Sequence, residues 1–507
     1  MNGSNTTRRK LLGLSLAAGV AAMVPSGFVA SRAAAQGKTT VTLAQTGDPI
    51  LNAVMQANNF NQLYERLVFD NLTVFDENHQ PQPRLAESWE TSADSKEITL
   101  RLRKDAKFHS GRALTAADVI YSLQQAAVPE NLSQLRSLAQ IIASAEAIDD
   151  ATVRLTLSEP TGRMFELFEL TPIVDKETFS HIEGGQNVVG TGAYIWKSYQ
   201  PGNSIVLEAN PDHWGGSPEV KTIEILIIRE SQALIAALRS GRADAIFGLT
   251  FLDVATVGPG FNVVNSGGRE AYVVGLDASA APFNDIAARQ AVAKSIDRER
   301  INKQVFRGAG TATSLWWAQG TPGWSEELSN YWKYDPETAK AEIAKLGLAG
   351  TKLPVTVNGA DLVNRSVFDI VRNNLEAIGF AVEPQIIDGA EFNARNSSLT
   401  LGTCFLHKTG FGSLSEVACA TATLHLRPGG GTHFDSQEFK DLIAAATAAS
   451  GEAQAAANTN LGQYLVEQAF NLPSVAVQPP IVTVPGLDDL KTTNAFQYIL
   501  PSSFSGA

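Results

Sequence analysis

The side chains able to do chemistry are few and scattered in this chain of 507 residues. It holds two cysteines, Cys404 and Cys419, and seven histidines, and none of them lies in a C-x-x-C pair or in a cluster spaced for zinc or redox chemistry. The loosest pair, His425 and His433, flanks a triple glycine. There is no G-x-S-x-G, H-E-x-x-H or P-loop motif, so a secreted hydrolase stays open only as a carboxylate-pair glycosidase, whose acids meet only in space. We expect no catalytic residue, no metal ligand and no cofactor.

The remaining candidates suit binding. Aromatic rings offer faces on which peptides or sugars stack, and those in or near predicted loops are Tyr272, Trp316, Trp317, Trp324 and Phe411. We expect Trp316 or Trp317, but not both, to provide such a surface. The loop Thr46-Gly47-Asp48 is a further candidate, because it follows the first predicted strand and open sheets bind ligands at the carboxyl ends of their strands.

Alternating side chains predict a region of antiparallel sheet in the first half of the chain. The apolar residues of E-I-T-L-R-L-R (97–103) share one face, which is the period of a half-exposed strand. The segments 152–157 and 204–209 repeat the pattern.

Helix signals are equally clear. Thr115 followed by Asp118 at the third helical position predicts a capped helix start. Asp335-Pro336 predicts a second start, and Gly347 marks the end of that helix.

The two halves of the chain differ in their predicted structure. The stretch 353–387 reads strand, helix, Gly379, strand, which is the order of a βαβ unit with parallel strands. We therefore expect sheet-rich structure before about residue 220 and doubly wound α/β structure after about residue 270. Glycine-rich pieces at 258–260 and 266–268 predict one crossing between the halves, and the proline-rich stretch 473–485 predicts a second.

Residues 1–35 have the pattern of an export signal. A basic start precedes an apolar run (11–24) that is too short to span a bilayer core of about 30 Å, and small residues follow it. We expect cleavage before Gln36 and a periplasmic mature protein. The pair Arg8-Arg9 predicts a twin-arginine signal, and a general secretory signal is the alternative.

The formal net charge is -12, from 40 Lys+Arg against 52 Asp+Glu. Removal of residues 1–35 takes away four basic residues and no acidic one, so the mature protein is more acidic still. This balance excludes nucleic acid as a favoured partner.

Four stretches together resemble the family 5 extracellular solute-binding proteins, the periplasmic dipeptide, oligopeptide and nickel receptors of ABC transporters. The strongest match is the long ordered pattern from Leu85 to Leu123. The others are V-G-T-G-A-Y (189–194) with N-P-D-H-W (210–214), P-F-N-D-I-A-A-R-Q-A-V-A-K-S-I-D-R-E-R-I (282–301) and Y-D-P-E-T-A-K (334–340).

The resemblance implies an α/β, two-lobed clamshell of the periplasmic-binding-protein type II, cluster C-like, with an extra sheet-rich subdomain in lobe I. It implies a monomer that binds a small solute between its lobes and docks on an ABC permease. The expected layout is a cleaved signal (1–35), lobe I (36–270) with the subdomain at about 70–190, lobe II (271–475), and a C-terminal return to lobe I (476–507).

The resemblance also points to a ligand wall at 404–416. In the family's peptide receptors the matching segment reads like GW-x-x-D-x-x-DP, and its aspartate accepts the peptide ammonium group. Here Gly410-Phe411 stand for the glycine and the aromatic residue, Ser413 falls near the expected acid, and Glu416 could replace that acid. Burying an ammonium group without a carboxylate costs several kcal/mol.

His407 and Lys408 bring positive or switchable charge to the same segment, which favours an anionic or sugar-like ligand; a solvated hairpin edge is the alternative. The loop beginning at Asn358 faces the solute in the family, but its only arginine, Arg365, comes late. The possible ligands are therefore a peptide or peptide-like solute, an opine, a sugar-phosphate conjugate, an oligosaccharide or a nickel chelate. Cys404 and Cys419 form either a bridge or two free buried thiols.

Overall fold

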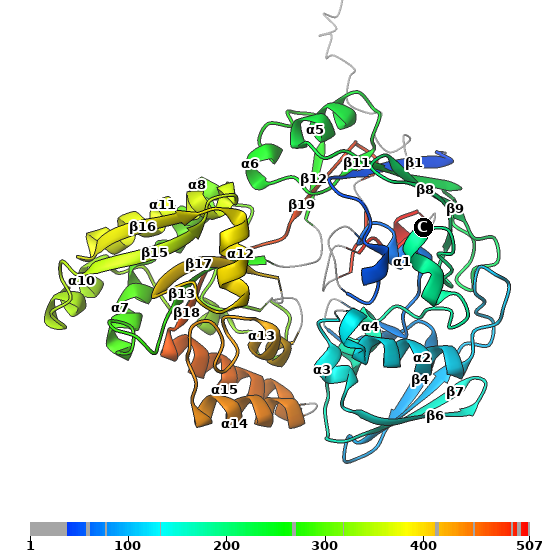
Figure 1. The fold of residues 1–507 in the computed structure, drawn as a ribbon, viewed down its shortest axis with the longest axis horizontal. Coiled ribbons are helices and arrows are strands. Elements are labelled where there is room, and N and C mark those ends of the chain that lie inside the picture. The colour runs from blue at the N-terminus through cyan, green and yellow to red at the C-terminus, as the bar shows by residue number, and fades with distance from the viewer. Residues whose placement is uncertain are drawn as a thin grey trace, which may run out of the picture.

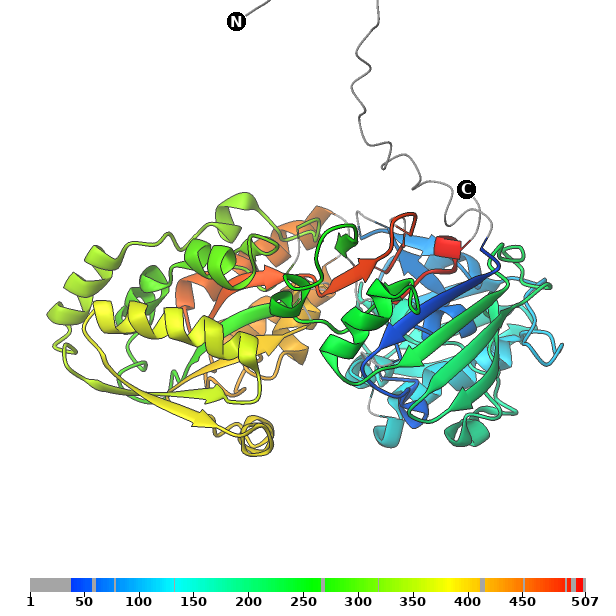
Figure 2. The ribbon, with the colours of Figure 1, turned by 90° about the horizontal axis from the view of Figure 1, so that it is seen from above.

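Two large β-sheets, each with its own helices, divide the structure into two bodies that we call lobe I and lobe II (Figures 1 and 2). This computed structural model describes residues 38–56, 61–76, 79–131, 133–265, 270–317, 319–410, 415–449, 452–487, 490–493 and 498–504. The predicted export signal lies outside the described residues. Among them, lobe I comprises those in 38–265 and 478–504, and lobe II those in 270–477.

The lobe I sheet has seven strands. In sheet order they are β12 (Asn262–Asn265), β19 (Pro480–Thr483), β11 (Ala245–Ile246), β1 (Thr40–Gln45), β10 (Thr222–Ile227), β9 (Ser204–Ala209) and β8 (Tyr194–Gln200). The central strand β1 pairs in parallel with β10 and β11, and the other pairs are antiparallel. Val41 and Leu43 of β1 are buried, as a central strand covered on both faces requires.

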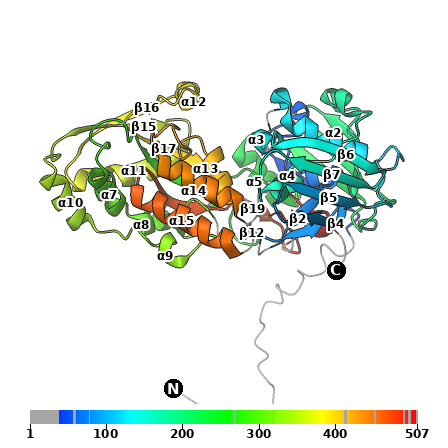
Figure 3. The ribbon, with the colours of Figure 1, turned by 90° about the horizontal axis from the view of Figure 1, so that it is seen from below.

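A separate four-stranded antiparallel sheet forms a subdomain of lobe I (Figure 3). Its strands are β4 (Ala86–Thr91), β5 (Glu97–Leu102), β7 (Thr152–Leu157) and β6 (Ile142–Asp149), and its helices are α2 (Ala116–Ala127), α3 (Arg136–Ala139) and α4 (Met164–Leu170). Ile98, Leu100 and Leu102 are buried on one face of β5, which confirms the predicted strand and its period.

The start of α2 is capped as its sequence predicts. The Asp118 carboxylate accepts hydrogen bonds from the backbone nitrogen of Thr115 at 3.0 Å and from its hydroxyl at 2.7 Å. These bonds occupy donors that a helix start would otherwise leave unpaired.

The remaining elements of lobe I are short. They are β2 (Thr73–Phe75) and β3 (Pro81–Pro83), the helices α1 (Glu65–Val68), α5 (Ser231–Arg239) and α6 (Phe251–Val254), and the 3-10 turns η1 (Leu51–Ala53), η2 (Pro129–Asn131), η3 (Phe179–Gly184) and η4 (Pro501–Phe504). The end of the chain is fastened to this lobe, because Tyr498, Ile499 and Phe504 are buried and the Phe504 carbonyl accepts from the backbone nitrogen of Glu219.

The lobe II sheet has six strands. In sheet order they are β14 (Thr311–Ala312), β18 (Asn471–Val477), β13 (Glu270–Leu276), β17 (Cys404–Thr409), β15 (Lys352–Asn358) and β16 (Ala381–Ile387). Strand β15, helix α11 (Leu362–Ala377) and parallel strand β16 form the predicted βαβ unit. Gly379 follows the helix with a φ of 114°, a conformation that favours glycine.

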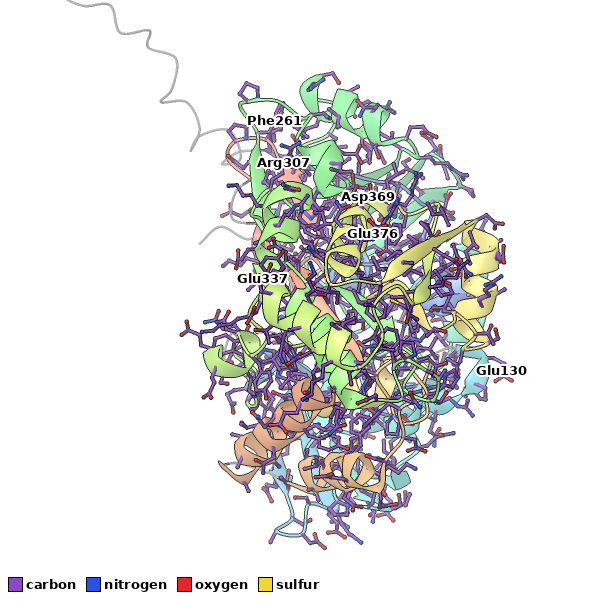
Figure 4. The ribbon with its side chains drawn as sticks, turned by 90° about the vertical axis from the view of Figure 1, so that its left-hand side faces the viewer. Glu130, Phe261, Arg307, Glu337, Asp369 and Glu376 are labelled. Atoms are coloured by element: carbon purple, nitrogen blue, oxygen red, sulfur yellow. The ribbon has the colours of Figure 1, made fainter. Side chains whose placement is uncertain are left out.

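Eight further helices belong to lobe II. They are α7 (Ile286–Ser295), α8 (Arg298–Val305), α9 (Glu326–Ser329), α10 (Pro336–Lys345), α12 (Gly389–Ser397), α13 (Glu416–Ala422), α14 (Gln437–Ala448) and α15 (Glu452–Gln468). Helix α10 starts at the predicted Asp335 cap and is followed by Gly347 in the left-handed region. The exposed acids Glu337 of α10 and Asp369 and Glu376 of α11 belong to the face seen in Figure 4.

The chain passes between the two sheets twice. It leaves lobe I after β12, and it returns between β18, which ends at Val477 in the lobe II sheet, and β19, which begins at Pro480 in the lobe I sheet. Figure 1 shows β19 running between the two bodies. The main hydrophobic core of each lobe is built from its own residues, with Phe251 of lobe I packed at the edge of the lobe II core.

Candidate functional site

The candidate loop of lobe I uses its carboxylate within the lobe. Asp48 accepts hydrogen bonds from the Tyr199 hydroxyl at 2.9 Å and the Gly202 nitrogen at 2.6 Å, and it pairs with Arg229 at 3.1 Å. Burial alone would raise the pKa of this carboxyl group, but these donors lower it below its ordinary value. Asp48 thus joins the end of β1 to the turn between β8 and β9, and the neighbouring Thr46 hydroxyl lies beside Gly248.

The candidate wall of lobe II is the end of strand β17. The alternation of this strand buries His407 and exposes Lys408. The Lys408 ammonium group lies 3.2 Å from the Glu270 carboxylate of β13, and its side chain is 47% exposed. Gly410 is half-buried, while the predicted site residues Phe411 and Ser413 lie outside the described residues.

His407 belongs to a buried network of neutral polar groups. Its Nε2 lies 3.2 Å from the Asn471 side-chain nitrogen, and its ring centre lies 4.6 Å from that of His425. The same Asn471 nitrogen donates to the His425 carbonyl, and the Asn471 oxygen accepts from the Trp316 indole at 2.8 Å. Burial, together with the nearby His425, lowers the pKa of His407 well below its ordinary value. The structure thereby corrects the expectation that His407 brings positive or switchable charge to the wall: only Lys408 carries positive charge there.

Three of the aromatic candidates within the described residues, Tyr272, Trp316 and Trp317, are buried in this conformation. Trp316 and Trp317 are at most 1% exposed, within a core built largely from α13, α14 and α15. Tyr272 is 4% exposed, and its ring centre lies 5.0 Å from that of Phe306. Trp324 is only partly buried and packs at the edge of that core. The expectation that Trp316 or Trp317 offers a stacking surface therefore does not hold in this conformation, because the core covers both rings.

Glu416, the expected substitute for the missing acid, is the first residue of α13 and is completely buried. Its carboxylate accepts from the Gly323 nitrogen at 2.5 Å and from the Asn458 side chain at 2.8 Å. Burial raises the pKa of this group, and the donated hydrogen bonds oppose that rise. Glu416 thus joins α13 to α15 and to the loop before α9, and its oxygens are already in use.

The loop after β15 forms a tight turn into α11. Asn358 accepts from the Ala360 nitrogen at 3.0 Å, and Asp361 caps α11 by accepting from the Asn364 nitrogen at 2.9 Å. Leu362, the first residue of the helix, is 61% exposed. This edge of lobe II therefore presents an apolar side chain beside a capped helix start.

The two cysteines are free. Cys404 of β17 and Cys419 of α13 are both completely buried and unbridged, and burial raises the pKa of each thiol to about 12. Of the two alternatives left open by the sequence, the structure shows two buried thiols.

One contact between the lobes had no sequence signal. The ring of Phe251 in α6 meets that of Phe306, just after α8, with centres 5.3 Å apart and nearly perpendicular planes. Asn471 also had no sequence signal, because a single asparagine in an apolar strand carries no recognisable pattern. Its side chain contacts the rings of Trp316 and His407 and the His425 carbonyl.

The described residues contain neither a metal centre nor a membrane span. In this part of the chain, no group of three or more histidine, cysteine, aspartate or glutamate side chains is placed to hold a metal ion. Nor is any of its helices both long and apolar enough to cross a membrane.

Comparisons with known proteins agree with this architecture. Solved structures with the same fold include a binding protein from Listeria monocytogenes (TM-score 0.81, 17% identity, covering 91% of this chain and 99% of that one) and the agropinic acid complex of AgaA from A. tumefaciens R10 (TM-score 0.73, 23%, 92% and 96%). The α/β fold of the cluster C binding proteins is thus confirmed over more than nine-tenths of the chain.

Sequence relatives agree as well. The chain is 28% identical over 415 residues to the periplasmic oligopeptide-binding protein OppA of Escherichia coli, covering 70% of this chain and 71% of that protein. It is 24% identical over 385 residues to heme-binding protein A of Haemophilus influenzae, covering 69% and 70%. Residues 80–411 match the family model described as bacterial extracellular solute-binding proteins, family 5, middle. As predicted, the chain belongs to this family of solute-binding proteins, whose members are not enzymes.

Proposed function

We propose that this protein is the periplasmic substrate-binding component of an ABC importer. It captures a peptide or peptide-like solute between its lobes and delivers the solute to a permease in the inner membrane. The predicted export signal, whether twin-arginine or general secretory, would place it in the periplasm, where it would act as a monomer.

The observation that carries this proposal is the way the lobes are connected. Each lobe has its own sheet and core, and the strands of the described residues place two crossings of the chain between the lobes. Two rigid bodies joined by short crossings can open and close, and a solute that contacts both bodies favours the closed state. Surfaces brought together in this way bury most of a small ligand.

Relatives make a peptide the first ligand class to test. OppA of Escherichia coli is named for oligopeptides, and the solved structure of AppA from Bacillus subtilis holds a nonapeptide (TM-score 0.74, 18% identity, covering 92% of this chain and 98% of that one). The predicted contacts are Lys408, Gly410, Phe411 and Ser413 at the end of β17, with Thr46 and Asn358 from the facing loops.

An organic acid such as an opine is the second candidate. Asp48 and Glu416 already accept hydrogen bonds from their own lobes, whereas Lys408, although it pairs with Glu270, is nearly half exposed. In the described part of the predicted site, the Lys408 ammonium group is therefore accessible to a ligand, whereas the Asp48 and Glu416 carboxylates already bond within the protein. An anionic group on the ligand would suit this balance, and the agropinic acid complex of AgaA shares the fold.

The first experiment is mass spectrometry of any solute released when the purified protein is denatured, followed by calorimetry with the identified compound. A released peptide supports the first ligand class and contradicts the second, and a released opine does the reverse. Failure to bind any peptide, opine or sugar conjugate would contradict the binding function itself.

Variants at Lys408 test the site. For an anionic ligand, Lys408→Gln should weaken binding about tenfold, because a charge-assisted contact is lost. The matched control is Lys352→Gln, which removes another exposed lysine that pairs with a glutamate, Glu383. Equal affinities of the wild type and Lys408→Gln would exclude this residue from the site. The same site could deliver its solute to a membrane sensor instead of a permease. Loss of solute uptake in a permease deletion would support transport.

A further inference from the structure

Two acids and one arginine lie buried together where α1, α4 and the C-terminal segment of lobe I meet. Glu65, Arg66 and Glu169 are each at most 5% exposed. The Arg66 guanidinium lies over the Tyr498 ring, 4.5 Å from its centre, and donates to the Glu169 carbonyl oxygen at 2.5 Å. Tyr498, from the last described segment, closes the cluster and is itself completely buried.

The two carboxylates differ in the hydrogen bonds that they accept. One oxygen of Glu169 accepts from the Phe75 nitrogen at 3.0 Å. Glu65 faces the Tyr498 hydroxyl, and within the described part of the chain neither of its oxygens accepts a hydrogen bond from the backbone. Glu65 is therefore the acid whose ionised form this environment supports least.

The charges of the cluster do not balance if both acids are ionised. A single guanidinium can compensate one carboxylate, and a second buried carboxylate without a cation costs several kcal/mol. A proton retained on one of the two carboxyl groups costs less free energy. Burial raises the pKa of Glu65 to about 8, opposed by Arg66 and Tyr498.

The same balance acts on Glu169, with further groups nearby. Burial raises the pKa of Glu169 to about 7, opposed by Arg66 and the Phe75 nitrogen, and the charge of Glu166 adds to the rise. The Tyr64 phenol, next to Glu65 on α1, is fully buried and stays neutral, because burial and the charge of Glu65 raise its pKa well above its ordinary value.

We propose that a proton held by Glu65 fastens the C-terminal segment, residues 498–504, to lobe I, and that loss of this proton loosens the segment. An ionised Glu65 needs water, and displacement of Tyr498 is the direct way to admit it. Beyond Tyr498, the segment is held by backbone hydrogen bonds such as Ile499 nitrogen to Gln62 oxygen at 3.2 Å and Leu500 nitrogen to Lys491 oxygen at 2.9 Å. The segment follows β19, so the proton would link the pH to one of the two crossings between the lobes.

The pH dependence follows from the raised pKa. The stability contributed by this proton is fully present below the pKa of an unfolded glutamate, about 4.3, and is lost as the pH rises through the folded value. Hydrogen exchange of the Ile499 and Leu500 amides should therefore show protection that falls tenfold or more between about pH 6 and about pH 9, after correction for intrinsic exchange.

The Glu65→Gln variant keeps the volume and removes the titration of Glu65, so its protection should fall much less than that of the wild type over this range, with Glu169 as the source of any remaining fall. The control is Glu90→Gln, which removes an exposed acid paired with Arg101 in the subdomain and should behave as the wild type. Constant protection in the wild type, or an unchanged pH dependence in Glu65→Gln, would overturn the proposal.

A second measurement compares infrared spectra of the wild type and of Glu65→Gln, both with labelled glutamate carboxyl groups. At about pH 6 the wild type should show a protonated carboxyl signal that is missing from the variant and that disappears by about pH 9. Absence of this signal at the lower pH would also overturn the proposal. None of these outcomes depends on the ligand or on the importer function.

Discussion

In the subdomain of lobe I, the Arg112 guanidinium lies 2.6 Å from the Asp118 carboxylate and 2.5 Å from that of Asp175, and both acids are at most 2% exposed. The buried guanidinium of lobe II is held differently. Arg298 donates to backbone carbonyl oxygens, the nearest being that of Pro473 at 2.9 Å. Arg112, whose side chain is 24% exposed, is thus held by two buried acids, whereas the buried Arg298 is held by the backbone.

The contrast extends to other buried groups. In lobe I, Asp70 pairs with Arg84 at 2.7 Å. In lobe II, Glu416 is held by a backbone nitrogen and an asparagine, and His407 and His425 contact asparagine side chains. Neutral partners do not titrate, whereas carboxylate partners do. A guanidinium held by carboxylates, as Arg112 is, should therefore lose its support when those acids take up protons, and one held by carbonyl groups, as Arg298 is, should not.

The largest effect is expected for Arg112→Met. It leaves two buried carboxylates without their cation, which costs about 4 kcal/mol near pH 7. The loss should shrink at about pH 4, because Asp118, whose pKa Arg112 helps to keep low in the wild type, can then take up a proton. Urea unfolding with hydrogen exchange of lobe I amides measures both values, and Arg101→Met, at an exposed ion pair, should cost less than about 0.5 kcal/mol.

Arg298→Met tests the other side of the comparison. It leaves several buried carbonyl oxygens without a donor, which costs about 3 kcal/mol, and this loss should be the same near pH 7 and pH 4 because carbonyl groups do not titrate. The matched control is Arg300→Met, which removes a side chain that donates to Gln304 at the surface. A loss at Arg298 that shrinks in acid as at Arg112 would break the contrast between the lobes.

His425 gives lobe II an acid sensitivity of its own. Burial, with the charges of Arg427 and His433, lowers the pKa of His425 to about 4. A lowered folded pKa means that the stability is present above the unfolded value, about 6.5, and is lost as the pH falls toward the folded value.

Between about pH 8 and about pH 5, this histidine should destabilise lobe II by about 2 kcal/mol. His425→Gln should remove that share of the pH dependence, as measured by urea unfolding at both values. An unchanged dependence in the variant would place the acid sensitivity at another group.

The sequence predicted structure wherever the signal lies within a few residues. The Thr115 start, the Asp335 start with its glycine end, and the βαβ unit around α11 depend on local capping and side-chain period, and all three are confirmed. The family could also be predicted, because its motifs run in order along most of the chain.

The site could be predicted less well, because the environment of its side chains is set by distant residues. Strand β17 lies between two other strands of the sheet, and side-chain period alone does not show which of its side chains are buried. The sequence therefore suggests that His407 and Lys408 both bring charge to the site. Glu416 resembled a free acid because its partners Gly323 and Asn458 are 93 and 42 residues away along the chain.

Glu416→Gln should have the smallest effect on stability, and it tests whether Glu416 holds the fold of lobe II or binds the ligand. The amide keeps one acceptor oxygen for the Gly323 nitrogen but replaces the other with a donor that faces Asn458, so stability should fall by about 1 kcal/mol. Affinity for an amine-bearing ligand should stay within about twofold, because the carboxylate serves α13 and α15 and not the solute. Calorimetry and urea unfolding of the same preparation measure both values. A large loss of affinity with unchanged stability would instead make Glu416 the acceptor of the ligand's ammonium group. Lobe II would then pair a buried carboxylate with a positive charge, as lobe I does.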